Sequence, residues 1–397
     1  MVDNTMKKIA VIGLGTAGVQ SLAHCLSYLD NEWQVVSISD PDIPIFGIGE
    51  STFPTFVNAL SAGTSFCMYS ELVEGKLDST AKYGTMYEKW RNKNFINPLV
   101  GSNVTIHIDT FKLKEWALKE FSEKWGNKFE IIEGTVKEIK TVEDKAVVTI
   151  NDLSYEFDYV IDCSGKPKDF NDYNILNSTT NACLVHNIKV GSNFLHTKHV
   201  ATPDGWMFVI PLKSRTSYGY LYNSNITDKE TARTNFSKEI DVAIENLDNI
   251  EFSFTSYIVK NVIDGRVIKN GNNALFLEPM FANSLFLHDR VNKLLVDKIN
   301  KKSNLNINEE FYKSVKAASD MIYYFYHGGS LYKTPFWDWI VKESKVALDN
   351  SEAFKEAKKM SDHHKEVGGE DFTNWVFEPK NLAAIDNGMG YQNFNKK

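Results

Sequence analysis

Three glycines near the start of the chain have the spacing Gly-x-Gly-x-x-Gly, after an apolar run and before a helical pattern. In a dinucleotide-binding fold the first glycine permits a sharp turn, the second lets a pyrophosphate approach the backbone, and the third lets helix and strand touch. Free amides at the helix start would attract the phosphates. The segment contains Gly13, Gly15, Thr16, Ala17 and Gly18. A tight turn that binds no ligand is the alternative interpretation.

An acidic residue and a second glycine-rich loop extend this motif. Asp40 ends the next predicted strand, where it would accept a hydrogen bond from a ribose hydroxyl. The loop Gly47–Pro54 follows soon after and is rich in glycine and hydroxyl side chains. Such a loop can bend around a bulky isoalloxazine, which favours FAD over NAD. The predicted cofactor contacts in this loop are Gly49, Glu50, Ser51 and Thr52.

Hydrophobic periodicity predicts the elements that hold these loops. Lys8–Gly13 and Gln34–Asp40 are predicted as strands with a helix between them. Two further β-rich regions follow, and after about residue 286 the periodicity becomes helical. The strands predicted in those two regions are Phe129–Ile132, Thr135–Thr141, Lys145–Ile150, Tyr155–Cys163, Phe194–Val200, Trp206–Leu212 and Ser217–Tyr222.

Composition limits the function classes. The 397 residues carry a net charge of −7, so a basic nucleic-acid footprint is absent and we expect no nucleic-acid partner. No stretch approaches the ~20 apolar residues that a bilayer span needs, so we expect no membrane association. Four cysteines without a Cys-x-x-Cys pair favour a reduced, cytoplasmic location and predict no metal site. A homo-oligomer is compatible with this composition.

Six ordered segments between residues 13 and 337 resemble the flavin-dependent halogenases, the family that contains the tryptophan halogenases. The second loop matches the family pattern Gly-x-Gly-Glu-Ala/Ser-Thr-x-Pro, and Trp206–Pro211 is similar to Trp-x-Trp-x-Ile-Pro. The segments that carry the resemblance are Gly13–Gly18, Gly47–Pro54, Lys82–Trp90, Trp206–Pro211, Gly271–Pro279 and Lys333–Trp337. The order of the segments along the chain makes the resemblance specific.

The resemblance implies an α/β fold of the glutathione-reductase type that binds FAD. We expect the FAD-binding module to occupy residues 1–300, with an interleaved substrate sheet at about 171–260. Residues 301–397 would form a helical subdomain on the substrate side. Cofactor contacts are also expected from Val136, Gly271 and Asn272.

The implied activity is halogenation of an electron-rich aromatic substrate. FADH₂, O₂ and a chloride, bromide or iodide ion would give hypohalous acid, which Lys82 would hold near the substrate. A separate flavin reductase or diffusible FADH₂ would be required, since no second Gly-x-Gly-x-x-Gly is present. The residues expected to stand between flavin and substrate are Trp206, Phe208, Ile210 and Pro211. The alternative interpretation of Trp206 and Phe208 is that they are core aromatics.

Halide and substrate contacts also follow from the resemblance. The halide is expected at Asn283 and Ser284. Phe281 stands where tryptophan-type members carry a glutamate, and Glu278 could replace that carboxylate only if it points inward. An arginine expected after Asp109 is replaced by Thr110. The substrate is expected to contact Asn97, Pro98, Leu99, Phe336 and Trp337.

Two other functions remain open at this point. A single-component flavin monooxygenase would reduce its flavin with NADPH and would not depend on halide. A flavin-binding protein that has lost catalysis would bind FAD without forming product. The changes at Thr110, Phe281 and Ser284 motivate the second alternative.

Overall fold

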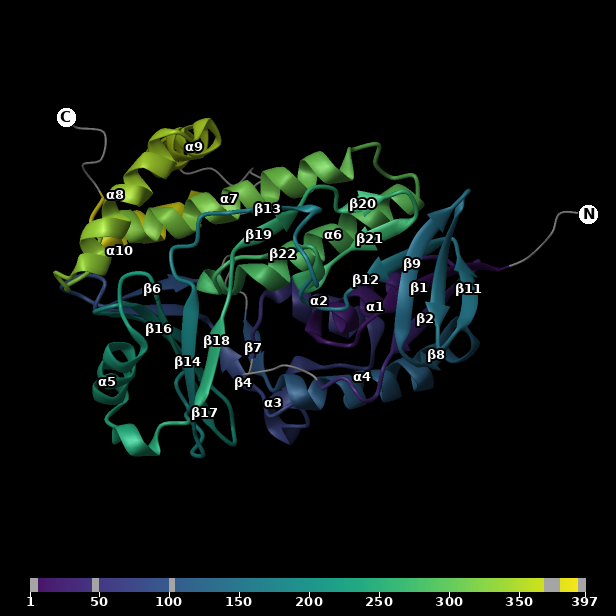
Figure 1. Ribbon diagram of the computed structural model, residues 1–397, viewed down its shortest axis with the longest axis horizontal. Helices are drawn as coiled ribbons and strands as arrows, with labels where there is room; N and C mark the ends of the chain where they lie inside the picture. Colours follow the sequence, from purple (N-terminus) through teal and green to yellow (C-terminus); the bar gives the residue numbers. More distant parts are fainter. Residues whose placement is uncertain (1–5, 45–49, 100–103, 368–378, 392–397) are drawn as a thin grey trace, which may run out of the picture.

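The computed structural model describes residues 6–44, 50–99, 104–367 and 379–391. Residues 47–49 of the predicted flavin loop, including the predicted contact Gly49, therefore lie outside the described residues. Figure 1 shows one sheet at each end of the long axis of the molecule, with the C-terminal helices over the end that carries the larger sheet.

A six-stranded sheet carries the glycine-rich turn. Its strand order is β20-β21-β12-β1-β2-β8, and every neighbouring pair is parallel except β20 and β21. β1 occupies the middle because its apolar residues are buried from both faces, as is usual in parallel sheets. The strands are β1 (Lys7–Ile12), β2 (Trp33–Ser39), β8 (Phe129–Glu133), β12 (Tyr159–Asp162), β20 (Ile263–Asp264) and β21 (Val267–Lys269).

Two different layers cover this sheet. Alternate residues of β1 point to opposite faces, so Ile9 and Val11 pack against the helices while Ala10 and Ile12 pack against a small antiparallel sheet. The result is a helix–sheet–sheet arrangement with the parallel sheet in the middle. The helical layer includes α1 (Thr16–Tyr28), α4 (Thr110–Trp125) and α6 (Asn283–Ile299); the small sheet consists of β9 (Val136–Val142), β10 (Lys145–Ile150) and β11 (Leu153–Phe157).

The second large sheet has seven strands in the order β18-β14-β17-β16-β15-β5-β6. Only the β15–β5 pair is parallel. Helix α5 (Lys229–Ile240) packs on the outer face of this sheet. The strands are β5 (Gly84–Glu88), β6 (Phe95–Pro98), β14 (Ala182–Ile188), β15 (Thr197–Thr202), β16 (Gly205–Pro211), β17 (Thr216–Tyr222) and β18 (Ile250–Ser253).

Two three-stranded sheets and further helices join these parts. One small sheet has the order β3-β7-β4, and the other has the order β13-β19-β22. The strands are β3 (Glu50–Ser51), β4 (Thr80–Lys82), β7 (Thr105–Ile108), β13 (Tyr173–Ile175), β19 (Tyr257–Val259) and β22 (Leu275–Phe276). The helices are α2 (Pro54–Gly63), α3 (Met68–Glu74), α7 (Ile307–His327), α8 (Pro335–Asp349), α9 (Glu352–Val367) and α10 (Pro379–Met389).

Most predicted strands are confirmed, and two expectations need correction. The segment Tyr155–Cys163 is not one strand: it divides at Asp158 into β11, which pairs with β10, and β12, which joins the parallel sheet. The Asp158 carboxylate accepts a hydrogen bond from the Lys8 amide at 2.8 Å, which fixes the chain at this crossing. The strand predicted from Phe194 begins only at Thr197.

Candidate active site

The glycine-rich turn has the shape that a dinucleotide requires. Gly13 has φ +87°, and a Cβ there would lie 2.4 Å from the carbonyl oxygen of Cys163. A Cβ on Gly18 would lie 1.9 Å from the carbonyl oxygen of Gly13, so helix and strand touch at this point. Beside Gly15, in contrast, the space is open to at least 4 Å. Since α1 begins at Thr16 without a side-chain cap, its first amides face this open space.

Asp40 follows the carboxyl end of β2, as predicted. Its side chain accepts hydrogen bonds from the Thr135 hydroxyl at 2.5 Å and from the Asp42 amide at 2.9 Å. These hydrogen bonds lower the pKa of Asp40, so the carboxylate is charged and available as an acceptor. Val136, the next predicted contact, is half-buried and packs against the apolar cluster of β1, β2 and β10.

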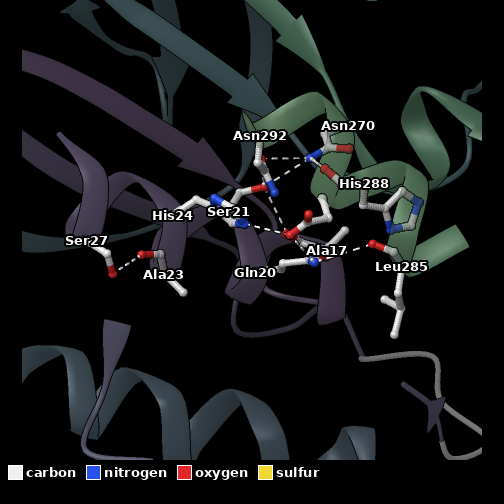
Figure 2. A network of polar contacts seen from close by, with 11 residues as sticks. Ala17, Gln20, Ser21, Ala23, His24, Ser27, Asn270, Leu285, His288 and Asn292 are labelled. Atoms are coloured by element: carbon white, nitrogen blue, oxygen red, sulfur yellow. Dashed lines mark hydrogen bonds and ion pairs between the residues drawn. The ribbon is translucent and has the colours of Figure 1, made fainter. Parts of the chain in front are cut away.

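A second backbone segment closes against α1. Gly271 has φ +62°, and a Cβ there would lie 2.8 Å from the Cβ of Ala17. Asn270 donates to the side chains of Ser21 and Asn292, at 3.2 Å and 3.0 Å. Figure 2 shows these side chains meeting between α1 and α6. The turn at residues 271–273, with Asn272 exposed, is thereby held beside the glycine-rich turn.

The same interface contains a buried contact between a histidine and an aspartate. His24 Nε2 lies 2.7 Å from Asp289 Oδ1, and Gln20 Nε2 donates to the same oxygen at 3.2 Å. Because α6 begins at Asn283, this pair links the cofactor helix to the helix that starts at the predicted halide residues. Cys163 lies close by with its sulfur 3.7 Å from the Ser21 hydroxyl, and burial raises its pKa, so it is an inert packing residue.

The described residues of the flavin loop that were predicted to contact the cofactor are buried or half-buried. Burial raises the pKa of Glu50 to about 7, although a hydrogen bond from the Thr16 hydroxyl opposes this shift. Ser51 contacts the Thr197 hydroxyl at 2.6 Å, and Thr52 donates to the Ile106 carbonyl oxygen at 2.6 Å. Glu50 and Ser51 therefore lie on β3, which pairs with β7, and Thr52 follows directly after that strand.

Lys82 is buried, with 2% of its surface exposed. Its ammonium donates to the carbonyl oxygen of Thr52 at 2.9 Å and lies 5.3 Å from the centroid of the Phe53 ring. Among the described residues no carboxylate forms an ion pair with it, and burial lowers its pKa to about 7. A lysine with this pKa has a substantial neutral fraction near physiological pH.

A chain of polar side chains runs beside Lys82. The Thr80 hydroxyl donates to the Pro211 carbonyl oxygen at 2.6 Å and lies 2.9 Å from His107 Nδ1, so Nδ1 is the donor in that contact. His107 Nε2 then accepts from the Thr197 hydroxyl at 2.9 Å. Burial, with the charges of Lys82 and His196, lowers the pKa of His107 well below its usual value. Both ring nitrogens of His107 are therefore engaged while the ring is neutral.

The predicted aromatic strand is confirmed as β16. Trp206, Phe208 and Ile210 face the main core, whereas Met207 and Val209 face the opposite side of the sheet. The Phe208 ring occupies space that Gly219 leaves free, because a Cβ there would lie 2.0 Å from Phe208 Cζ. Pro211, whose carbonyl oxygen accepts from Thr80, ends the strand.

The rings of His199 and Tyr87 lie beside those of Trp206 and Phe208, and we call these four rings the aromatic wall. The sequence patterns did not identify His199 and Tyr87 as functional. The His199 ring lies 4.5 Å from the Trp206 ring and 5.3 Å from the Tyr87 ring, between centroids. Phe281 lies 6.5 Å from His199. Burial, aided by the charge of Lys82, lowers the pKa of His199 to about 3. The available signal for Tyr87 was its place within the Lys82–Trp90 segment, and His199 had no comparable signal.

Glu278 points inward, which meets the condition set by the sequence analysis. One of its oxygens, Oε2, accepts hydrogen bonds from the hydroxyls of Thr179, of Thr180 at 2.8 Å and of Tyr326 at 3.3 Å. Burial raises its pKa, while these donors and the nearby Trp206 indole oppose the shift. The carboxylate is thus held inside the protein beside the aromatic wall.

The predicted halide residues begin α6. Asn283 is buried and donates to the Glu278 carbonyl oxygen at 3.4 Å, and Ser284 follows it in the first turn. The two preceding residues, Phe281 and Ala282, have φ +67° and +55°, so this loop turns sharply into the helix. Amides at the start of a 17-residue helix therefore face the loop.

The predicted substrate residues divide between two places. Trp337 and Phe336 lie in the core at the start of α8, where the Trp337 indole donates to the Thr202 carbonyl oxygen at 2.8 Å. Asn97, Pro98 and Leu99 lie at the end of the edge strand β6, half-buried or exposed. From that strand it is Phe95 that stacks on Tyr87, with centroids 4.9 Å apart.

Asp109 begins α4 and accepts from the Phe111 amide at 3.0 Å. The arginine missing at position 110 has a counterpart elsewhere, because Arg215 donates to Asp109 at 2.6 Å. A charge pair is therefore present at this helix start although the neighbouring residue is Thr110.

Comparison with known proteins identifies the family. A family model described as tryptophan halogenase matches residues 8–99 and 96–393. The chain belongs to the tryptophan halogenase family of flavin-dependent enzymes. The resemblance drawn from the motifs is thus confirmed, and membership implies the use of flavin and halide.

Relatives of this halogenase family match along most of their length. The chain is 21% identical to the tryptophan 6-halogenase ThaL of Streptomyces albogriseolus, over 99% of this chain and 86% of that protein. It is 20% identical to the tryptophan 7-halogenase RebH of Lentzea aerocolonigenes, over 83% of this chain and 78% of that protein.

Solved structures of halogenases share the fold. The tryptophan halogenase of Shewanella frigidimarina superposes with a TM-score of 0.77 at 15% identity, covering 97% of this chain and 89% of that chain. A flavin-dependent halogenase from Xanthomonas campestris superposes with a TM-score of 0.75 at 18% identity, over 97% and 89%. The predicted fold class is confirmed. Within the described residues, no helix is both long and apolar enough to cross a membrane.

Proposed function

We propose that the protein is an FAD-dependent halogenase that uses halide and O₂ to halogenate an electron-rich aromatic substrate through Lys82. The observation that carries the proposal is the placement of Lys82, buried and bonded to the carbonyl oxygen of Thr52. Its lowered pKa makes a neutral amine accessible. An amine or ammonium in that place is suited to bind hypohalous acid by a hydrogen bond or as a covalent adduct.

The cofactor side of the site fits FAD. The open space beside Gly15, the uncapped start of α1 and the closely packed Gly271 support pyrophosphate binding at the glycine-rich turn. Asp40 would accept a hydrogen bond from a ribose hydroxyl, and residues 50–52 would contact the flavin. When bound in its reduced form, FAD would supply the two electrons that reduce O₂ to the peroxide level, and oxygen at that level would oxidise halide to hypohalous acid.

The remaining residues would separate the flavin from the substrate and would bind the halide and the hypohalous acid. Trp206, Phe208 and Ile210 would separate the organic substrate from the flavin, which directs the oxidant toward halide. The start of α6 at Asn283 and Ser284 would bind the halide through helix amides. Lys82 would then hold the hypohalous acid against the substrate.

The proposal also covers the source of reduced flavin, the substrate and the domain boundaries. A separate flavin reductase or diffusible FADH₂ would supply reduced cofactor. The substrate would be a small aromatic compound bound near Phe336, Trp337 and the end of β6. The division into residues 1–300 and 301–397 remains a prediction.

The test combines purified protein, FAD, a flavin reductase, each halide in turn and a panel of phenols and indoles, with mass spectrometry of the products. We expect halide-dependent halogenated product. Hydroxylated product without halide would favour a monooxygenase, and FAD binding without any product would favour a protein that has lost catalysis.

Two lysine variants make this test specific. Lys82→Ala should abolish halogenated product while FAD binding and peroxide formation remain. Lys89→Ala is the matched control, because Lys89 comes from the same segment but forms a half-exposed ion pair with Glu239. Retained product in Lys82→Ala would refute the proposed role of Lys82.

A further inference from the structure

Glu50 places a carboxyl group beside the glycine-rich turn. Its Oε1 atom accepts a hydrogen bond from the hydroxyl of Thr16, at 3.4 Å, and Thr16 is the first residue of α1. At Gly15, the residue before Thr16, an added Cβ atom would have no neighbour within 4 Å. The carboxyl group of Glu50 therefore lies one side chain away from the open space that the first amides of α1 face.

Glu50 is half-buried, and among the described residues no charged group shifts its pKa. β3 holds it in place, because Glu50 lies opposite Ile108 of β7. Burial raises the pKa of the carboxyl group to about 7, and the hydrogen bond from the Thr16 hydroxyl opposes this shift without cancelling it. Near neutral pH the carboxylate and the neutral carboxyl form are therefore both populated.

The titratable and charged groups of the neighbouring elements have other partners. His107 of β7 is neutral and uses both ring nitrogens in hydrogen bonds. Asp109, which follows β7, is paired with Arg215 at 2.6 Å. Lys82 of β4, on the other side of β7, donates to a carbonyl oxygen. The first two turns of α1 and the whole of α2 contain no charged residue. Among these described groups, none provides a positive charge to balance both a Glu50 carboxylate and a phosphate at the start of α1.

We propose, on the basis of the FAD binding proposed above, that the carboxyl group of Glu50 is protonated in the complex with FAD. The pyrophosphate would carry two negative charges at the start of α1, and these charges disfavour a second anion beside them. A neutral carboxyl group can also donate a hydrogen bond to the cofactor, whereas a carboxylate can only accept one. Protein whose Glu50 is ionised would therefore take up one proton from the solvent when it binds FAD.

The affinity for FAD should fall as the pH rises above 7. In the free protein the pKa of Glu50 is about 7, and in the complex the phosphates and the added burial would raise it further. Below pH 7 both states hold the proton, so the Kd should be constant. Above pH 7 the free protein loses a proton that the complex keeps, so the Kd should increase, by at most about tenfold per pH unit.

Calorimetry of FAD binding to the unmutated protein tests the proposal. FAD is titrated into the protein at pH 8 in HEPES and in Tris, whose ionisation enthalpies differ, so the difference in heat gives the number of protons taken up. We expect about one proton per FAD, and a Kd about tenfold higher at pH 8.5 than at pH 6.5. Binding of FAD without proton uptake at pH 8 would overturn the proposal. Absence of FAD binding would instead contradict the proposed cofactor.

Glu50→Gln separates this proton from any other, because the amide has the shape of the carboxyl group but does not ionise. We expect the variant to match the unmutated protein at pH 6.5, to take up no proton at pH 8, and to bind FAD about tenfold more tightly than the unmutated protein at pH 8.5. Proton uptake that persists in Glu50→Gln would belong to another group and would overturn the role of Glu50.

Asp40→Asn is the contrasting variant, because Asp40 is also a predicted cofactor contact but has a pKa that hydrogen bonds lower. Its carboxylate remains ionised across the pH range of the experiment. The variant should therefore weaken FAD binding by the same factor at pH 6.5 and 8.5 and should keep the proton uptake. Loss of the proton uptake in Asp40→Asn, with the uptake retained in Glu50→Gln, would assign the proton to Asp40 and overturn the proposal.

Discussion

Lys82 Nζ and the carbonyl oxygen of Thr52 are 2.9 Å apart, which joins the lysine to the predicted flavin loop directly after β3. The two residues lie on β4 and directly after β3, and both strands pair with β7. The sheet therefore fixes the distance between the cofactor loop and the ammonium group. A reactive halogen species that forms near the flavin would meet the lysine at a constant place.

Halogenation should depend on pH through Lys82. Its pKa of about 7 means that the neutral amine increases as pH rises through that value. If the amine carries the halogen, the single-turnover rate should rise between pH 6 and 8 and then level off. Because a single group titrates, the rate should increase by no more than about tenfold per pH unit. Stopped-flow measurement with FADH₂ and bromide checks this. A rate that falls across the same interval would indicate that the ammonium form is required.

Lys82→Met should stabilise the fold. The folded-state pKa of about 7 lies below the usual value of 10.5, so the unfolded chain binds more protons between these values. Stability of the natural protein therefore rises with pH over this window, and the cost of burying the lysine is greatest below pH 7. Near pH 6 we expect the free energy of unfolding of Lys82→Met to exceed that of the natural protein by about 2 kcal/mol, with the loss of the hydrogen bond to Thr52 included. Urea unfolding at pH 6 and 10 should show this gain shrinking at the higher pH.

The sequence predicts those features of the site that are formed by residues close together in the chain. The glycine-rich turn and the alternation along β16 follow from chain geometry within a few residues, so their spacing identified Gly13–Gly18 and Trp206. His199, Tyr87 and Glu278 converge through strand pairing and loop packing between distant segments. Periodicity carries no information about such contacts. The division of 155–163 into two strands was missed for the same reason, since Asp158 is fixed by Lys8 far away in sequence.

Gly15→Ala should separate cofactor binding from folding. A Cβ at Gly15 has no atom within 4 Å, so the folded protein should accept it without loss of stability. The methyl group would occupy the space predicted for the pyrophosphate, and we expect FAD affinity to fall at least tenfold, or about 1.4 kcal/mol. Gly18→Ala is the contrasting variant, because its Cβ would lie 1.9 Å from Gly13 O and should destabilise the fold. Fluorescence titration and thermal melts distinguish the two; unchanged FAD affinity in Gly15→Ala would argue against the predicted site.

Asp289→Asn should weaken the contact between α1 and α6. The Asp289 carboxylate contacts both His24 and Gln20 inside the protein, so its loss should cost about 2 kcal/mol of unfolding free energy. Glu32→Gln at the exposed pair with Lys7 is the control and should cost less than about 1 kcal/mol. Because α6 starts at the predicted halide residues, the halide concentration for half-maximal rate should also rise in Asp289→Asn. Equal stability of the two variants would contradict this interpretation.

Gly219→Ala should disturb the aromatic wall through Phe208. The added methyl group would lie 2.0 Å from Phe208 Cζ, so the ring must move, at an expected cost of about 2 kcal/mol. The smaller side chain of Phe208→Leu should relieve the clash, and the double variant should therefore be more stable than the sum of the single effects predicts. Urea unfolding of the four proteins measures this coupling. A displaced Phe208 ring should also increase the hydrogen peroxide released per flavin oxidised, because Phe208 is proposed to separate flavin from substrate. Additive effects of the two substitutions on stability would show that the ring does not depend on the space at Gly219.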